Sequence, residues 1–537
     1  MRFPPLPIAV AAIALLNSCA SLAPFAPDMA AKAPRLEGYG HSDIAITTRS
    51  PEARELFNAG VLQAYAFNEN EAVRMFKAAL AKDASCAMCA WGVAWQLGPN
   101  INDTGRDNVP EAVKYVDYAL GHLDGATPRE RALVESLAVR YAHASKARET
   151  APLVAQRCAA AKAEDGKIHP LDEAYAEQLR KLVVQYPEDA DVMSLYAEAE
   201  FISAPDDQPW DKAGKPSGHL GEVADRLEKL LEKYPQHTGL NHYMVHVLDA
   251  PSVAQRAVPA ADRLGKLAPA SPHLLHMPAH TYINVGRFED ASRVNQLAVA
   301  ADVKLAEIEK AQGFELSKDW RGHDAQFLWY AAMVAGEEQV ALDAADTSAQ
   351  LEKDSDNNFG EYARSLRLVT LVRFERWNAV LSSAKPAGDK GMALAWWLFA
   401  RGVAQARTGH ADEAQAWLDQ LTPHAAQMRE KNAKRKRTVS MMDYAAARLE
   451  GEVALSRGDT NAAIAAFAKA ADGAVIADDN EPPMIADMAR TMLGDLQLKA
   501  GRWADAEGSF RKALADRPAH PQAQRGLHDA LAAQKKA

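Results

Sequence analysis

Residues 488–518 read MARTMLGDLQLKAGRWADAEGSFRKALADRP, and this stretch decides the fold. Apolar and small residues recur at spacings of three and four on both sides of the turn at Gly501, which predicts two amphipathic helices. Because the polar turn between them is short, the two helices must run antiparallel and pack against each other. The stretch therefore predicts a helical hairpin.

The same pattern resembles the tetratricopeptide repeat through a set of small, apolar and turn residues: Gly494, Leu498, Gly501, Ala504, Ala506, Phe510, Ala513 and Pro518. Weaker copies occur upstream, for example LFNAGVLQAYAFNENEAVRMFKAALAKD at 56–83 and FARGVAQARTGHADEAQAWLDQL at 399–421. The resemblance covers nearly everything from about residue 50 to 530. It implies an all-α fold, a right-handed α-solenoid of stacked helix pairs.

The chain divides by composition into segments of different character. We expect a signal peptide at 1–19, a tether and N-terminal cap at 20–50, an N-terminal solenoid at 51–350 and a C-terminal solenoid at 351–537. The N-terminal solenoid contains a histidine-rich section at 237–323. It also contains a segment rich in Pro, Gly and Asp at 203–219, which predicts an inserted loop.

The first residues have the composition of an export signal. Arg2 precedes an apolar stretch at 8–16 that is too short to span a bilayer. The following LNSC resembles the lipobox of bacterial lipoproteins, which implies that Cys19 becomes a lipidated N-terminus. Ala20 replaces the Asp that marks inner-membrane retention in such proteins. We therefore expect an outer-membrane lipoprotein facing the periplasm or exposed, or otherwise a secreted or periplasmic protein.

Charge and motifs narrow the classes of function. The net charge is −10 and no long basic run is present, which argues against a nucleic-acid partner. The sequence has no phosphate-binding glycine loop, no GxSxG and no HExxH, so neither nucleotide binding nor nucleophilic catalysis is supported. No catalytic residue is assigned.

Two histidine pairs occupy equivalent positions of neighbouring repeats. His276 and His280 each lie 34 residues after His242 and His246, which is the length of one tetratricopeptide repeat. Ser271 and the proline after it are a good N-cap and first helical residue, and they place both later histidines on the concave face of their helix. The spacing predicts that the two pairs lie side by side.

A histidine pair at i and i+4 can hold one ion, and four imidazoles from adjacent helices could converge on it. The predicted ligands are His242, His246, His276 and His280, with Asp249 completing or orienting the set. Imidazole and carboxylate ligands suit Zn, Cu or Fe, and also Ni or Mn. Pro278 predicts a kink between the two histidines of the second pair.

The alternative is a metal-free groove in which the histidines are polar lining that contacts a ligand. Its further lining residues would be His273, His323, Glu198, Tyr243, Tyr282 and Trp91, although Trp91 is also a candidate core residue. The first functional hypothesis is a scaffold that holds a peptide, a protein segment or a small ligand in this groove. The second is a metal-binding protein or metalloenzyme.

The cysteines other than Cys19 are odd in number. Cys86 and Cys89 form a single CxxC without the histidine of a haem attachment motif, and Cys158 is the third. In an oxidising compartment we expect a structural disulfide, either Cys86 with Cys89 or one of these with Cys158.

Four stretches also resemble those of a group of secreted bacterial tetratricopeptide-repeat lipoproteins without an assigned activity. They are HYMVH, HMPAH, CAMCAWGVAW followed by LGPNIN, and HDAQFLW. The resemblance implies a shared site around these residues and names no reaction.

Overall fold

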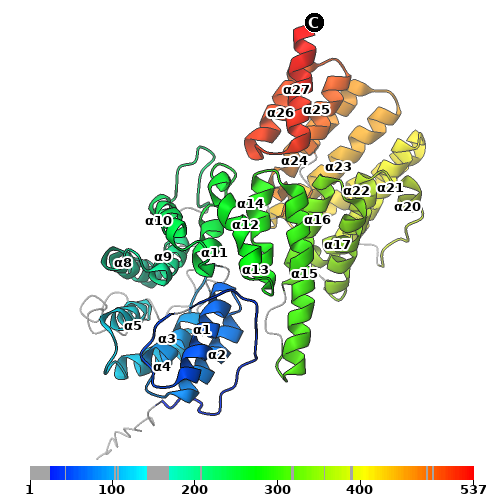
Figure 1. Cartoon of the computed structure of the whole chain (residues 1–537). Helices are drawn as coiled ribbons and strands as arrows, with labels where there is room; N and C mark the ends of the chain where they lie inside the picture. The colour runs from blue at the N-terminus through cyan, green and yellow to red at the C-terminus, as the bar shows by residue number, and fades with distance from the viewer. Residues whose placement is uncertain are drawn as a thin grey trace, which may run out of the picture.

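The computed structural model describes residues 25–42, 44–101, 105, 108–141, 168–205, 208–315, 320–355, 357–387, 391–478, 482–485 and 489–536. Within these ranges every named element is a helix, and strand-like pairing is confined to an isolated bridge between Trp210 and Pro216. The prediction of an all-α solenoid of tetratricopeptide-type helix pairs is confirmed by this architecture (Figure 1).

Sequential helices pair as antiparallel hairpins along the whole described chain. In the N-terminal half they are α1 (Pro51–Tyr65), α2 (Glu69–Lys82), α3 (Ala87–Gln96), α4 (Val109–Gly121), α5 (Pro128–Arg140), α8 (Pro170–Gln185), α9 (Ala190–Ile202), α10 (Leu220–Lys233), α11 (Thr238–Val247), η1 (Ala254–Ala257), α12 (Val258–Leu267), α13 (Pro272–His276), α14 (Pro278–Asn284) and α15 (Phe288–Ala311). In the C-terminal half they are α16 (Arg321–Ala335), α17 (Glu338–Leu351), α18 (Asn358–Ala363), α19 (Leu366–Arg373), α20 (Trp377–Leu381), α21 (Met392–Arg407), α22 (Ala411–Lys431), α23 (Lys436–Ser456), α24 (Thr460–Asp478), α25 (Ala489–Lys499), α26 (Trp503–Asp516) and α27 (Pro521–Lys536).

The hairpin of α25 and α26 shows why glycine is needed at two positions of this repeat. Gly501 closes the turn with φ of +73°, a conformation that residues with a side chain rarely adopt. A Cβ on Gly494 would lie 2.7 Å from the ring of Phe510, so only glycine lets the two helices approach this closely. The predicted hairpin at 488–518 is therefore present, and local sterics explain it.

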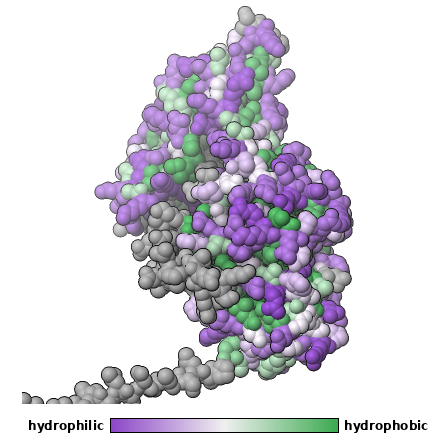
Figure 2. Space-filling view, turned by 90° about the vertical axis from the view of Figure 1, so that its left-hand side faces the viewer, coloured by the Kyte–Doolittle hydropathy of each residue, from purple (hydrophilic) through white to green (hydrophobic). Residues whose placement is uncertain are grey.

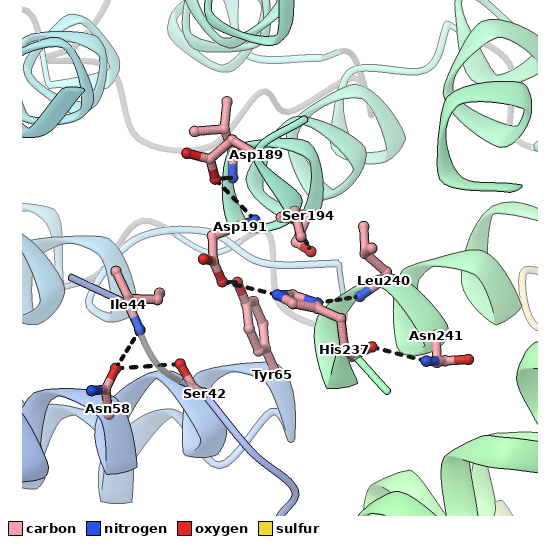
Figure 3. Close-up of polar contacts among 12 residues, drawn as sticks. Ser42, Ile44, Asn58, Tyr65, Asp189, Asp191, Ser194, His237, Leu240 and Asn241 are labelled. Carbon is pink, nitrogen blue, oxygen red and sulfur yellow. Dashed lines mark hydrogen bonds and ion pairs between the residues drawn. The ribbon is translucent and has the colours of Figure 1, made fainter. Parts of the chain in front are cut away.

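The inserted loop packs against the histidine-rich section. The indole Nε1 of Trp210 donates to the carbonyl of Val247 at 2.6 Å, which fastens the loop to the end of α11. The N-terminal segment before α1 is also fastened, because Asn58 Oδ1 accepts from the Ile44 N–H at 3.0 Å and lies 3.3 Å from Ser42 Oγ (Figure 3).

The turn before α27 contacts the histidine-rich section. Gly286, in the turn between α14 and α15, has φ of +82°, and a Cβ there would lie 2.7 Å from the carbonyl oxygen of Ala519. The rings of Phe288 and His520 are 6.3 Å apart at the same contact. The turn before α27 is thus seated against the turn after α14, near the centre of the molecule (Figure 1).

Among the described residues no helix is long and apolar enough to cross a bilayer. The face in Figure 2 shows hydrophobic residues in patches among hydrophilic ones. The predicted signal peptide and Cys19 lie outside the described residues, as does Cys158.

Candidate metal centre

Two clusters of three histidines lie in the core where three consecutive repeats meet. In each cluster, one nitrogen from every ring lies within 4.8 Å of the other two. Five of the six histidines are less than 10% exposed, and the sixth, His323, is half-buried. The clusters are trio A (His242, His246 and His273) and trio B (His276, His280 and His323).

Trio A is positioned by helix α11 and the start of α13. His237 caps α11, since its Nδ1 accepts from the N–H of Leu240 at 3.1 Å. His242 and His246 follow on one face of that helix, one turn apart. The Nε2 atom of His242 lies 3.0 Å from Nε2 of His246 and 3.0 Å from Nε2 of His273.

Trio B is positioned by a break in a helix. The predicted cap is present, with Ser271 Oγ accepting from the Leu274 N–H at 3.2 Å, but α13 ends at His276 and α14 begins at Pro278. Proline has no N–H to continue the hydrogen-bond ladder, so the two helices meet at Met277. His276 and His280 still converge across this break, with their Nε2 atoms 2.9 Å apart.

In the rings of His276 and His280, hydrogen bonds at Nδ1 determine which nitrogen carries the proton. Nδ1 of His276 lies 2.7 Å from Asn295 Oδ1 and 3.3 Å from Asp324 Oδ1, and the amide of Asn295 is oriented by its own bond to the Ala291 carbonyl. Nδ1 of His280 lies 2.7 Å from Asp249 Oδ2. All of these partners are oxygen acceptors, so both Nδ1 atoms are the donors.

A neutral imidazole has a single N–H, so the two Nε2 atoms that face each other in trio B both present lone pairs. The environment of the ring makes it unfavourable to add a proton between these two nitrogens. Burial holds the pKa of His276 well below its usual value, and the charges of His323 and His280 lower it further. Two lone pairs 2.9 Å apart therefore fit a shared metal cation better than a proton.

The nitrogen separations also fit a metal ion. A tetrahedral ion with Zn–N bonds of ~2.0–2.1 Å holds two ligand nitrogens about 3.3 Å apart. The Nε2 pairs at 2.9 Å and 3.0 Å need to open by only about 0.3–0.4 Å to reach that geometry. Side-chain rotations of this size require no change of fold.

Burial also disfavours a positive charge on two histidines of trio A, His242 and His246. It lowers the pKa of His242 to about 3, against the opposing effect of a hydrogen bond with the Tyr65 backbone, and it holds the pKa of His246 well below its usual value. Neutral imidazole is the form that binds metals. Beside trio B, the Asp249 carboxylate is largely buried and the Asp324 carboxylate is fully buried, so negative charge is available to balance cations.

A phenylalanine ring covers each trio. Phe67 lies against trio A with ring centroids 4.6–5.4 Å from its three histidines, and Phe327 lies 4.5–4.8 Å from those of trio B. Both rings are almost completely buried. They replace water over the histidines with an apolar wall, which strengthens electrostatic interactions inside.

Phe67 reaches trio A because α1 is joined to α9 and α11. The Tyr65 hydroxyl donates to Asp191 Oδ1 at 2.8 Å, and His237 Nε2 contacts the same oxygen at 3.1 Å (Figure 3). Asp191 belongs to α9 and His237 caps α11, so one carboxylate ties three helices together. Phe67 follows two residues after Tyr65, with φ of +52°.

The structure divides the four histidines predicted for a single site between two groups. His242 with His246, and His276 with His280, each group with a histidine from the following repeat, His273 and His323. The trios are nevertheless adjacent, since the rings of His273 and His276 are 6.4 Å apart. Successive helices are offset along their axes, so the second position of one helix lies level with the pair on the helix before it.

Asp249 was predicted either to bind the ion or to orient a ligand. Its Oδ2 contacts Nδ1 of His280 at 2.7 Å, which is the contact expected of an orienting residue. Sequence reasoning missed Asn295, Asp324 and the two phenylalanines. Asp324 and Phe327 lie within HDAQFLW and were available as a signal, but Asn295 is on the outer helix of its repeat. Nothing in the local sequence distinguishes it from a surface asparagine.

The residues predicted to line an open groove are buried instead. Glu198, Tyr243, Tyr282, Trp91 and His273 are at most 3% exposed. Trp91 donates to the Leu133 carbonyl at 3.2 Å and stacks on Trp95, which is the core role considered for it. At this position α1 and Phe67 pack against α11.

Glu198 and Tyr282 lie apart from both trios. Glu198 accepts from Trp95 Nε1 at 3.2 Å, and burial raises the pKa of its carboxyl to about 7. The Tyr282 hydroxyl donates to Asp262 Oδ1 at 2.9 Å, and the Arg287 guanidinium lies over its ring. Neither residue offers an atom to a shared ion.

Cys86 and Cys89 are joined by a disulfide, one of the two pairings expected from the sequence. Cys86 is the N-cap of α3, and both residues are fully buried. The bond braces the first turn of the helix that carries Trp91 and Trp95.

No protein-family model and no curated protein matches the chain. Among solved structures, the tetratricopeptide-repeat domain of P58(IPK) is 10% identical with a TM-score of 0.23, over 90% of this chain and 98% of that one. Cut9, in the Cut9–Hcn1 hetero-tetramer of the APC/C, is 13% identical with a TM-score of 0.30, over 89% and 76%. Human IFIT1, a dimer with m7Gppp-AAAA, is 12% identical with a TM-score of 0.33, over 79% and 90%.

Proposed function

We propose that this protein binds two transition-metal ions, one in each histidine trio, in the core of its solenoid. The observation that carries the proposal is the contact of His276 with His280. Their Nε2 atoms face each other at 2.9 Å while Asp249 and Asn295 hold the protons on the other nitrogens. Orienting partners of this kind are typical behind metal-bound histidines.

The donor set narrows the choice of metal. Three neutral imidazoles suit Zn, Cu, Fe or Ni, whereas Mg and Ca prefer oxygen ligands. Copper binds nitrogen sites most tightly among the first-row divalent ions, and zinc takes three histidines readily. Copper and zinc are therefore the ions to test first.

Three protein ligands leave room for a fourth on each ion. In zinc proteins, four protein ligands are typical of structural sites, and three protein ligands with one open position are typical of catalytic sites. Adjacent trios would place two such ions near each other, as in two-metal enzymes. This supports a metalloprotein with reactive or ligand-binding capacity, and it ranks the second functional hypothesis above the open histidine groove.

The proposal is tested by metal analysis of full-length protein purified without chelator or histidine tag. Elemental analysis should give two equivalents of copper or zinc per chain. His242→Gln should remove the ion of trio A and leave that of trio B, and His280→Gln should do the reverse. Protein that neither retains nor takes up a transition metal, and whose melting temperature is unchanged by added copper or zinc, contradicts the proposal.

His520→Asn is the matched control. His520 is as buried as the trio histidines, at 3% exposed, and lies outside both trios. Its side chain accepts from the Ala523 N–H, a capping role that asparagine can retain. This variant should keep both metal equivalents. Its loss of metal would mean that any buried histidine change disturbs the fold enough to empty the sites.

We further propose that the chain is exported, anchored to the outer membrane through Cys19, and presents its solenoid surface to a protein partner. The lipobox-like LNSC and the helical-repeat architecture support this. Incorporation of labelled palmitate into the wild type, and its loss in Cys19→Ser, is the expected result. An unlabelled wild-type protein found in the soluble periplasmic fraction would exclude the anchor.

A further inference from the structure

A separate cavity of about 180 Å³ lies among the inner helices of the C-terminal half. Its walls come from α16, α19, α20, α21, α23, α25 and α27. Four aromatic rings take part, those of Trp377, Trp396, Phe399 and Tyr444. Met333 is the lining residue nearest to trio B along the chain, and ten residues of helix separate it from His323, about 15 Å. The cavity is therefore distinct from the histidine trios.

The cavity contains more positive than negative charge. Arg407 and Arg448 both line it and share a single buried carboxylate, Glu452, through contacts of 2.6 Å and 3.2 Å. Arg448 also donates to the Tyr444 hydroxyl at 2.8 Å, which holds its guanidinium in place. One carboxylate thus serves two guanidinium groups.

A third arginine adds to the excess. Arg373 is half-buried, and burial lowers the pKa of its guanidinium from the usual value, with the nearby Arg448 charge acting in the same direction. Glu375 opposes this effect but is exposed. Three arginines thus face two carboxylates, those of Glu452 and Glu375, which leaves an excess of positive charge at the cavity.

Two donors at the cavity also lack an acceptor among the described residues. They are Nε of Arg373 and the indole Nε1 of Trp396, and each atom is shielded from solvent. Trp396 itself is only 1% exposed. A buried donor without a partner is unfavourable, so a site with two of them favours an occupant that brings acceptor oxygens.

We propose that this cavity binds a small organic acid, a single carboxylate on an aromatic or branched aliphatic body. A carboxylate offers the acceptor oxygens and the negative charge that the guanidinium groups recognise. The aromatic walls accept the apolar body. A cavity of ~150 Å³ accommodates benzene in another protein, so this one has room for one ring or its equivalent in branched carbons.

Calorimetry with benzoate, phenylacetate and isovalerate as probes tests the proposal on the full chain. At least one acid should bind saturably at one molecule per chain. Benzamide or phenylacetamide, which match the shape without the charge, should bind about tenfold more weakly or not at all, as expected when a charge-assisted hydrogen bond is lost. Failure of all three acids to bind at millimolar concentration, or equal binding of acid and amide, overturns it.

Arg373→Gln should weaken binding of the best acid about tenfold while leaving the melting temperature unchanged or higher, because it removes a buried like charge beside Arg448. Arg376→Gln is the matched control, since Arg376 is three residues away, exposed and paired with Glu338, and it should bind as wild type does. Unchanged affinity in folded Arg373→Gln refutes the site.

Two further measurements separate this site from other interpretations. His280→Gln should bind the acid normally, so the result does not depend on the metal centre. A peptide ending in phenylalanine that binds when the free acids do not would show that the cavity is part of a longer peptide groove, which also overturns the proposal.

Discussion

At the scale of single residues, the decisive feature is the proton on each histidine nitrogen. Asp249 and Asn295 accept from Nδ1 of His280 and His276, and this leaves both Nε2 lone pairs pointing at one place. A histidine pair on a helix is common, but a pair with both tautomers set in this way is suited to binding a cation. Asp249 and Asn295 thus determine which nitrogen of each histidine is available to a cation.

Asp249→Asn should weaken metal binding at trio B by about 10–100-fold, because the imidazole of His280 loses its charged orienting partner. Trio A should be affected much less, since Asp249 contacts a histidine of trio B. Competition titration with a chromophoric chelator measures both affinities. Asp262→Asn, which changes a carboxylate bonded to Tyr282 and Arg287, serves as the control. Equal weakening of both trios would show that Asp249 acts on the fold rather than on His280.

At the scale of the element, the break between α13 and α14 shapes trio B. Pro278 was predicted to kink one helix, and the structure has two helices that meet at Met277. His276 and His280 lie on either side of this break with their Nε2 atoms 2.9 Å apart, so a change of backbone at Pro278 would move one ring relative to the other. Trio A has no such break, because His242 and His246 lie within one continuous helix.

Pro278→Ala should keep the fold, with the free energy of unfolding changed by no more than about 1 kcal/mol, because alanine can adopt the same backbone angles. It should lower the affinity of trio B selectively by allowing a straighter helix. Metal titration followed by elemental analysis would show one tight equivalent instead of two. Pro521→Ala, at the start of α27, is a control outside the site. Two equally tight equivalents in Pro278→Ala would mean that the break is incidental.

At the scale of the whole molecule, the C-terminal end closes onto the histidine-rich section. His520 is buried in that contact beside Phe288, and Lys212 of the inserted loop reaches Asp516 at 2.6 Å. Burial lowers the pKa of His520 to about 4, and the charges of Arg517, Arg525 and Arg373 lower it further. The closure is therefore expected to depend on pH.

The unfolded chain binds a proton at His520 with an ordinary pKa of 6.5, above that of the folded chain. Its contribution to stability is therefore complete above pH 6.5 and is lost as pH falls toward about 4. Between pH 7 and 5 the loss from this one group is about 2 kcal/mol. Urea unfolding at both pH values should show a loss smaller by this amount in His520→Asn. An identical loss in variant and wild type would place His520 in a solvated position.

Local sequence rules predicted some features of the fold and the site, but not the contacts between repeats. The hairpin at 488–518 and the Ser271 cap followed from local rules, because turn residues, caps and helical periodicity act within a few residues. The pairing of His242 with His246, and of His276 with His280, followed for the same reason. Grouping into trios did not, because it depends on the axial offset between neighbouring repeats.

The sequence by itself determined the helical repeats, the two histidine pairs and their equivalence in neighbouring repeats, since all of these depend on spacing along one helix or one repeat. Helix packing, which the sequence does not reveal, adds His273 and His323 to the trios and places Asn295 behind the ring of His276. The same packing brings Phe67, 206 residues before His273 in the chain, over trio A. These contacts depend on how helices distant in sequence pack, and side-chain packing between them has no periodic signature along the chain.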